Sequence, residues 1–596
     1  MDTKNREEID VNYKWNLEDM FKNNEEFESS FASINSLLEK VLSYKDHIMD
    51  SSESLYKFYK DNEALERVLY KVLIYAHLLC DTDTTNKKYQ ELKMRVDKLS
   101  EDVSSALSFI NTEMLKKDYN EVLEFIANDS RLEEYRFDLE QTYRYKEHIL
   151  SSEEETIISK ALNTFGTGDD VFYNFDNADI KLGNIKDEKG NEVELTNSNY
   201  TKYMNSKDRN VRIQAFNNMY NYFGNFKNTI AAALKGNIKE NFFSSEVRKF
   251  NSPLEESLYS DNISIDVYNN LIESIHDRLP SLYEYMKIKK KALYLDELHM
   301  YDIYVDLVSN LELDIPFEEG KKIVFDALKP LGEQYISDLN EAFDKKWIDI
   351  YPNKGKKSGA YSWGCYDSMP YVLLNYNNTI DSVSTMAHEL GHSMHSFYSI
   401  KNQTYINHEY PIFLAEIAST VNEVLLNNYL YENAKTKEEK ILYLTEFLEK
   451  VRTTIYRQTM FAEFEKIMHD KYAKGESLTE DNFSQTYYDL NKLYYGEDVV
   501  SDDSIRYEWA RIPHFYSSFY VYKYATGLSS AIAIAYKILS GDEKARDAYL
   551  KLLSSGGSNY PLELLREAGI DMTTKEPILN AIDMFDEKLE ELKQLI

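Results

Sequence analysis

The stretch His388-Glu389-Leu390-Gly391-His392 indicates a metal-binding helix. Two histidines at positions i and i+4 lie one above the other on one face of a helix, so both imidazoles can reach one metal ion. Glu389 sits one position further round the helix, where its carboxylate can act on water at the metal. Catalytic zinc typically takes three protein ligands, and two histidines with one glutamate form a known set. The pattern therefore predicts a zinc hydrolase.

Three residues that follow this motif are candidates for the third ligand: His395, Glu409 and Glu416. His388 and His395 are separated by about 10.5 Å of helix rise, which favours a role for His395 in substrate contact or in supporting the ligands. Glu409 lies in a polar loop, where it is expected to be solvated. Glu416 lies in an apolar helical run, where an isolated carboxylate is costly unless it is paired or bound to metal. We therefore expect Glu416 to be the third ligand.

Two further residues fit a metal site on this helix pair. Glu423 follows Glu416 by seven residues on the same helix face. A metal-bound histidine usually donates its other N–H to a carboxylate or carbonyl, so Glu423 is a candidate for that partner, with an exposed helical glutamate as the alternative. Gly391 costs a helix about 1 kcal/mol relative to alanine. Its presence is explained if another backbone or a ligand comes close to it.

A second candidate region is the aromatic segment 511–527. It contains His514 together with Tyr516, Tyr520, Tyr522 and Tyr524. Peptide hydrolysis passes through a negatively charged tetrahedral intermediate, which a tyrosine hydroxyl or a histidine N–H can stabilise. The spacing does not select one tyrosine for this role.

Composition limits the classes of function. The chain has 596 residues, which is too long for one compact core, and its net charge of −33 excludes the basic surface that a nucleic-acid-binding protein needs. Two cysteines cannot form a disulfide framework. Residues 1–15 lack the apolar core of a signal peptide, and no run approaches the roughly 20 apolar residues of a membrane span. We expect a soluble cytoplasmic protein without nucleic-acid or membrane partners, and the oligomeric state stays open.

The local patterns divide the chain near residue 195. Residues 17–162 contain neither proline nor glycine and have apolar residues at helical spacing, for example over 54–79 and 87–107. Residues 180–195 are typical of a hairpin that turns at Gly190-Asn191. We expect an N-terminal helical lobe over 1–195 that ends in this hairpin, and a catalytic domain over 196–596.

A short non-helical stretch precedes the metal helix. Gly359, Ala360, Tyr361 and Ser362 are expected to form a loop, and residues 370–376 a short strand. Pro370 at its start fits an edge strand or the first residue of a strand. Such an edge strand is expected to bind a peptide backbone by strand addition.

Together these segments resemble oligoendopeptidase F, of the thimet-oligopeptidase-like metallopeptidases. The matching residues lie in 15–21, 359–361, 370–371, 387–395, 413–419 and 512–522. The resemblance implies a mostly α, two-lobed helical metallopeptidase with a deep central channel, a small β-sheet near the metal helix and cleavage of short peptides.

The resemblance also implies roles for residues. One zinc ion per chain would be held by His388, His392 and Glu416, with Glu389 as the general base. His514 and a late tyrosine, which we assign to Tyr522, would bind substrate or stabilise the oxyanion. Substrate contacts are expected from the other residues of the two matching regions: Gly359, Ala360, Tyr361, Tyr516 and Tyr520. We predict a zinc-dependent endopeptidase of short oligopeptides. The alternatives are a zinc exopeptidase and a non-enzymatic helical peptide-binding protein.

Overall fold

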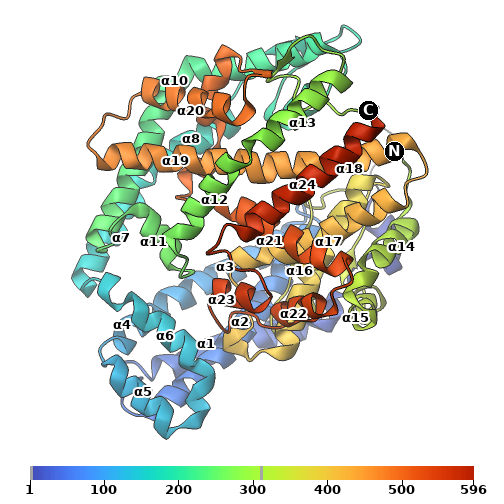
Figure 1. Ribbon diagram of the computed structural model, residues 1–596. Coiled ribbons are helices and arrows are strands. Elements are labelled where there is room, and N and C mark those ends of the chain that lie inside the picture. The colour runs from blue at the N-terminus through green and yellow to red at the C-terminus, as the bar shows by residue number, and fades with distance from the viewer. Residues whose placement is uncertain (1–3, 309–312) are drawn as a thin grey trace. The chain divides into compact units, whose positions relative to one another are not determined.

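Helices dominate the computed structural model, which describes residues 4–308 and 313–596 (Figure 1). The expected mostly helical fold with small sheets is confirmed. Contacts divide the chain into two units. The first comprises Met1–Glu147, Glu312–Leu426 and Ile534–Gly569, and the second comprises His148–Leu311, Asn427–Ala533 and Ile570–Ile596.

This division differs from a single boundary at residue 195. The predicted hairpin is present as the antiparallel strands β1 (Asn184–Lys186) and β2 (Glu192–Glu194). The hairpin is tied to the second unit, because the backbone N–H of Lys186 donates to Gln214 of α10 (Arg209–Val247). Residues 148–195 therefore belong with the helices that follow them rather than with those that precede them.

The first unit begins with long helices. Its helices are α1 (Asn24–Leu42), α2 (Ser52–Thr82), α3 (Lys87–Leu107), α4 (Ile110–Met114), α5 (Tyr119–Asn128), α6 (Arg136–Arg144), α14 (Phe317–Leu328), α15 (Glu333–Asp344), α16 (Ile380–Asn402), α22 (Glu543–Leu553) and α23 (Pro561–Glu567). Asn23, Ser51 and Asn86 cap α1, α2 and α3, each by accepting a backbone N–H of the first turn. The expected helices over 54–79 and 87–107 are confirmed.

The chain turns sharply after α3 although it has no glycine or proline there. Asp118 begins α5 with a capping box, and Asp129 accepts the backbone N–H of Arg131. Side-chain caps therefore separate the short helices in this stretch. Helices α1 to α6 share one apolar core, which also includes Tyr371 and Leu373 near the metal helix.

A three-stranded sheet lies beside α16, the helix that carries His388 and His392. Its strand order is β4 (Ile348–Asp349), β6 (Tyr371–Leu373), β5 (Tyr361–Trp363). Strand β6 pairs parallel with β4 and antiparallel with β5. Two expectations are therefore wrong: the strand after Pro370 is the central strand, and Tyr361 and Ser362, expected in a loop, lie in the edge strand β5. Strand β4 is too short to show the alternation that identifies a strand in sequence.

The second unit is built around α10. Its helices are α7 (Ser152–Phe165), α8 (Thr167–Asn174), α9 (Asn197–Met204), α10, α11 (Pro253–Tyr259), α12 (Ile265–Asp277), α13 (Leu279–Ala292), α18 (Lys437–Val451), α19 (Arg457–Ala473), α20 (Glu480–Tyr495) and α24 (Glu576–Leu595). Helices α17 (Ile412–Glu432) and α21 (Tyr522–Leu539) cross the division between the units. Strands β3 (Leu298–His299) and β7 (Val499–Val500) form a parallel pair.

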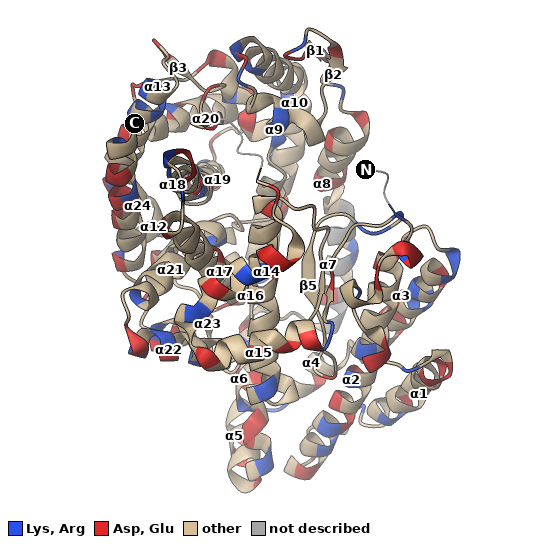
Figure 2. Ribbon diagram, turned by 90° about the vertical axis from the view of Figure 1, so that its right-hand side faces the viewer, with Lys and Arg blue, Asp and Glu red and all other residues tan. Residues whose placement is uncertain are grey.

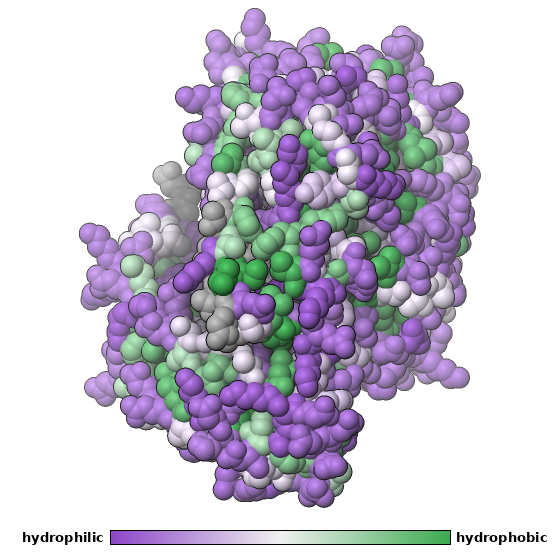
Figure 3. All heavy atoms as spheres, turned by 90° about the vertical axis from the view of Figure 1, so that its left-hand side faces the viewer, coloured by the Kyte–Doolittle hydropathy of each residue, from purple (hydrophilic) through white to green (hydrophobic). Residues whose placement is uncertain are grey.

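Charged side chains of both signs are interspersed along the helices, as on α1, α2 and α22 in Figure 2. The face shown in Figure 3 is largely hydrophilic. Within residues 4–308 and 313–596, no helix has the length and apolar character that a membrane crossing requires.

Candidate active site

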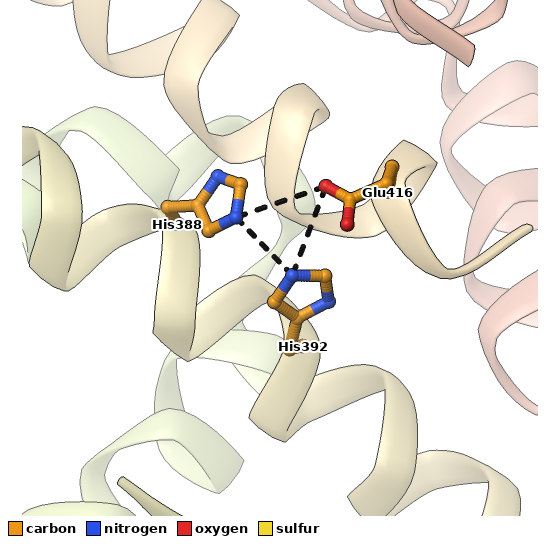
Figure 4. Close-up of side chains that lie close together, drawn as sticks. All are labelled: His388, His392 and Glu416. Atoms are coloured by element: carbon orange, nitrogen blue, oxygen red, sulfur yellow. Dashed lines mark hydrogen bonds and ion pairs between the residues drawn. The ribbon is translucent and has the colours of Figure 1, made fainter. Parts of the chain in front are cut away.

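Helices α16 and α17 bring His388, His392 and Glu416 together (Figure 4). The Nε2 atoms of the two histidines lie 3.2 Å apart. Oε2 of Glu416 lies 3.8 Å from Nε2 of His388 and 4.0 Å from Nε2 of His392. Two ligands of a tetrahedral zinc ion are about 3.3 Å apart, so a shift of the carboxylate by less than about 1 Å fits this set to the ion.

The sequence explains why α16 and α17 come so close. Thr379 caps α16 by accepting the backbone N–H of Ser382. A Cβ atom at Gly391 would lie 2.5 Å from Cα of Ser419 and 2.7 Å from the carbonyl oxygen of Ala418. Glycine is therefore needed at this crossing of the helix carrying the histidines and the helix carrying Glu416. The close backbone approach predicted from Gly391 is confirmed.

Each of the two histidines is oriented by a second contact. Oε1 of Glu423 lies 3.0 Å from Nδ1 of His388. The carbonyl of Ala415 accepts a hydrogen bond from His392. Burial and the neighbouring His388 lower the pKa of His392 to about 3, so its ring is neutral near pH 7, as metal binding requires.

Glu389 lies on the side of α16 that faces strand β5. Its side chain is 7% exposed, and the backbone N–H of Ser362 donates to its carboxylate. Burial raises the pKa of Glu389 to about 7, with His388 and the Ser362 N–H opposing the rise and Glu416 adding to it. The hydroxyls of Ser362 and Ser393 are 2.8 Å apart and form a second link between β5 and α16. A carboxyl group that titrates near neutral pH beside a metal site can take and return a proton.

The other third-ligand candidates lie elsewhere. The ring of His395 is 1% exposed and stacks on Tyr410, with ring centroids 3.5 Å apart. Burial lowers the pKa of His395 to about 3. Glu409 is exposed, and neither residue belongs to the metal cluster found within the described residues. One premise was wrong: Glu416 is not buried, because its side chain is 48% exposed.

The segment before β5 is held by side-chain contacts. Gly359 has a φ of 81°, and its carbonyl accepts a hydrogen bond of 2.8 Å from the Asn375 side chain. The Tyr361 hydroxyl donates to Asp81 at 2.8 Å, which ties β5 to α2. A cavity of about 230 Å³ borders Gly359, Ala360 and the first turns of α16, including Asp381 and Thr385.

The aromatic candidates lie in the second unit. The Tyr524 hydroxyl is 3.3 Å from Nε2 of His514, and the Tyr520 ring lies parallel to the His514 ring with centroids 6.3 Å apart. Tyr522 differs, since it is fully buried and its ring lies against Tyr268 with centroids 5.4 Å apart. Tyr516 stacks on Phe172 of α8 at 4.6 Å between centroids. We call His514, Tyr520 and Tyr524 the aromatic triad.

A model of peptidase family M3 matches residues 202–584, and a model described as oligopeptidase F matches residues 113–181. The chain belongs to peptidase family M3. It is 40% identical over 591 residues to oligopeptidase PepF of Bacillus subtilis, covering 99% of this chain and 88% of that one. It is 38% identical over 592 residues to group B oligopeptidase PepB of Streptococcus agalactiae, covering 99% of this chain and 98% of that one.

Solved structures agree with this membership. A putative peptidase from Chlamydophila abortus superposes with a TM-score of 0.95 at 36% identity, over 100% of both chains. Oligoendopeptidase-F from Enterococcus faecium gives a TM-score of 0.73 at 33% identity, over 96% of this chain and 99% of that one. The expected resemblance to oligoendopeptidase F is confirmed, and the chain is a peptidase.

Two backbone groups that contact the candidate residues were not predicted. Ala415 acts through its backbone carbonyl and Ser362 through its backbone N–H, and neither group has a signature in sequence. The contact of Tyr524 with His514 in the second unit depends on the backbone conformation between His514 and α21, which spacing does not give.

Proposed function

We propose that this M3 peptidase is a zinc-dependent endopeptidase that hydrolyses internal bonds of short oligopeptides. The observation that carries the proposal is the convergence of two imidazoles and one carboxylate beside the buried acid Glu389. Two imidazoles and a carboxylate suit zinc. The relatives named above as oligopeptidases and as oligoendopeptidase-F support oligopeptides as the substrate class.

His388, His392 and Glu416 would hold the zinc ion, and Glu423 and Ala415 would keep the two rings in place. When bound, zinc polarises the scissile carbonyl and lowers the pKa of water. Glu389 takes a proton from the attacking water and later passes it to the leaving amine. Its pKa of about 7 suits both directions of transfer near neutral pH.

The peptide backbone is proposed to pair with β5, an edge strand of the sheet. An edge strand has unpaired N–H and C=O groups along one side, and a bound peptide can add to it as a further strand. Ser362 of β5 also contacts Glu389, so a peptide on this strand would lie beside the acid that activates water. The cavity near Gly359 and Asp381 would take a substrate side chain.

His514 and a tyrosine of the aromatic triad are proposed to donate hydrogen bonds to the substrate or to the oxyanion, with Tyr524 or Tyr520 favoured over the buried Tyr522. We also propose a cytoplasmic location, without nucleic-acid or membrane partners.

An internally quenched peptide of about ten residues, blocked at both ends, tests the proposal. We expect cleavage at an internal bond, loss of cleavage with a chelator and recovery when zinc is restored. Metal analysis should find one zinc ion per chain. Release of single amino acids from unblocked peptides, with no cleavage of the blocked peptide, would identify an exopeptidase. Recovery with manganese or cobalt but not with zinc would overturn the metal assignment.

A further inference from the structure

Phe519 has an unusual backbone conformation in the middle of the aromatic segment. Its φ is 50°, in the left-handed region that residues with a Cβ atom disfavour. The ring is 1% exposed and lies against Tyr268 and His469, with centroid distances of 5.8 and 4.5 Å. Such a conformation persists where surrounding contacts hold it, and it is frequent near functional sites.

One of those contacts comes from a buried acid on α19. The backbone N–H of Phe519 donates to Oε1 of Glu465 at 2.6 Å. Glu465 is 3% exposed, and its Oε2 atom has no hydrogen-bond partner among the described residues. Burial raises the pKa of the Glu465 carboxyl group well above its usual range, with the Phe519 N–H opposing the rise.

An apolar side chain at 465 would avoid the cost of burying a carboxyl group. What it would lack is an acceptor for the Phe519 N–H, and a buried unpaired N–H is costly in turn. The carboxyl group is therefore explained by this one contact. Two neighbouring hydrogen bonds are made to backbone carbonyls instead: the Ser257 hydroxyl donates to Ser518 at 2.9 Å, and the Asn237 side chain donates to Tyr516 at 3.3 Å.

The turn at Phe519 decides which way the neighbouring rings point. Phe519 turns into the interior, whereas Tyr520 remains partly exposed and lies parallel to His514. Helix α21 then begins at Tyr522, so Tyr524 falls within its first turn, 3.3 Å from His514. A different conformation at residue 519 would change the direction in which α21 starts and separate the three rings.

We propose that Glu465 is a positioning residue: its carboxyl group fixes the left-handed turn at Phe519, and this turn holds the aromatic triad in the arrangement that the reaction needs. The inference rests on the proposed function of the aromatic triad. Whether Glu465 holds the turn at Phe519 can be measured independently of that function. Nothing in the sequence pattern distinguishes Glu465 from an ordinary helical glutamate.

The test compares Glu465→Gln, which keeps an oxygen acceptor, with Glu465→Leu, which removes it. Glu463→Leu is the matched control, because Glu463 lies on the same helix and accepts from His276 and Tyr494 instead. We expect the Leu variant at 465 to lose about 10- to 100-fold in kcat with little change in KM and unchanged zinc content. The Gln variant and the control should stay within about threefold of wild type.

Hydrogen exchange of the backbone amides in 515–521 supplies the measurement that does not depend on activity. Exchange should accelerate at least about tenfold in Glu465→Leu and remain at the wild-type rate in Glu465→Gln and Glu463→Leu. If Glu465→Leu does not fold, Glu465→Asp replaces it in the test, because the shorter side chain moves the acceptor away from the Phe519 N–H by one methylene.

Wild-type exchange and wild-type kcat in Glu465→Leu would overturn the proposal, and so would equal losses in the Leu and Gln variants. An inactive wild-type enzyme would overturn the proposed peptidase function instead, and the exchange rates would still decide whether Glu465 holds the turn.

Discussion

Oε1 of Glu423 lies 3.0 Å from Nδ1 of His388, while Nε2 of the same ring faces His392 and Glu416. This contact leaves Nε2 as the nitrogen of His388 that is available to the proposed metal ion. Carboxylates in this position raise the basicity of the ligand and hold its ring orientation. The two residues come from different helices, so the contact also links α16 to α17.

Glu423→Leu should therefore weaken zinc binding by about 10- to 100-fold. Glu423→Gln retains an oxygen that can accept from Nδ1–H and should lose less. Titration against a chelator of known zinc affinity measures both. Equal affinity in wild type and the Leu variant would show that His388 is oriented by other contacts.

Gly391→Ala should damage the metal site through the backbone. The added Cβ would collide with Ser419 and Ala418 and push apart the helices that carry the ligands. We expect a loss of thermal stability and zinc content well below one ion per chain. Gly236→Ala is the matched control on α10, where an added Cβ meets nothing within 4 Å. That variant should be neutral or stabilised by roughly 0.4–1 kcal/mol.

Glu389→Gln should retain zinc and lose turnover. The amide keeps the size of the side chain but cannot take a proton, so kcat should fall by about 10²- to 10⁴-fold. Metal analysis of the same preparation provides the control. A variant with full zinc content and wild-type kcat would refute the assignment of Glu389 as the general base.

Tyr524→Phe should reduce kcat more than Tyr522→Phe. The first change removes a hydroxyl 3.3 Å from His514, whereas the second changes a ring buried against Tyr268. We expect a loss of at least about tenfold for Tyr524→Phe, the scale on which single oxyanion contacts act. A larger effect at Tyr522 would restore the assignment made from the sequence.

Stability should depend on pH through Glu449 in the second unit. Burial raises the pKa of Glu449, but Arg452 and Lys289 outweigh it and bring the pKa to about 2. Because the folded pKa lies below the unfolded one, the stabilisation is complete above about pH 4.5 and is lost as the pH falls toward about 2. Glu449→Gln leaves two buried cations without their partner and should cost roughly 3 kcal/mol near pH 7.

Denaturant titrations of both proteins over this pH range measure the difference. The gap between wild type and Glu449→Gln should be constant above about pH 5 and should narrow on acidification. A gap that widens at low pH would contradict the depressed pKa.

The metal site was predictable because its chemistry resides in side chains at fixed helical spacing. The positions of His388, His392 and Glu389 follow from the spacing within one helix. Gly391 predicted the close approach of another backbone, which is that of α17. The choice of Glu416 was supported by the geometry although the reason given, burial, was wrong. The Glu416 carboxylate comes from a second helix, α17, and remains exposed there.

The errors arose where the outcome depends on residues far away in sequence. Pro370 suggested an edge strand, but pairing with the two-residue strand β4 makes β6 central. The assignment of Tyr522 came from the family resemblance and stays a prediction; the left-handed turn at Phe519 interrupts any regular spacing between His514 and α21, so spacing alone could not select a tyrosine. The boundary at residue 195 stays a prediction; the contacts divide the chain differently, into two units that each draw on three separate stretches.

The discontinuity of the first unit has a consequence for biosynthesis. Helix α22, residues 543–553, packs against α16, and the Tyr549 hydroxyl reaches the carbonyl of Ala418 beside Gly391. A ribosome adds about 5–20 residues per second, so α16 and α17 emerge on the order of ten seconds before α22 exists. During that interval His388 and His392 are present without the packing of α22 against their helix. Zinc loading in the cell is therefore expected to follow release of the nearly complete chain rather than to accompany translation of the motif.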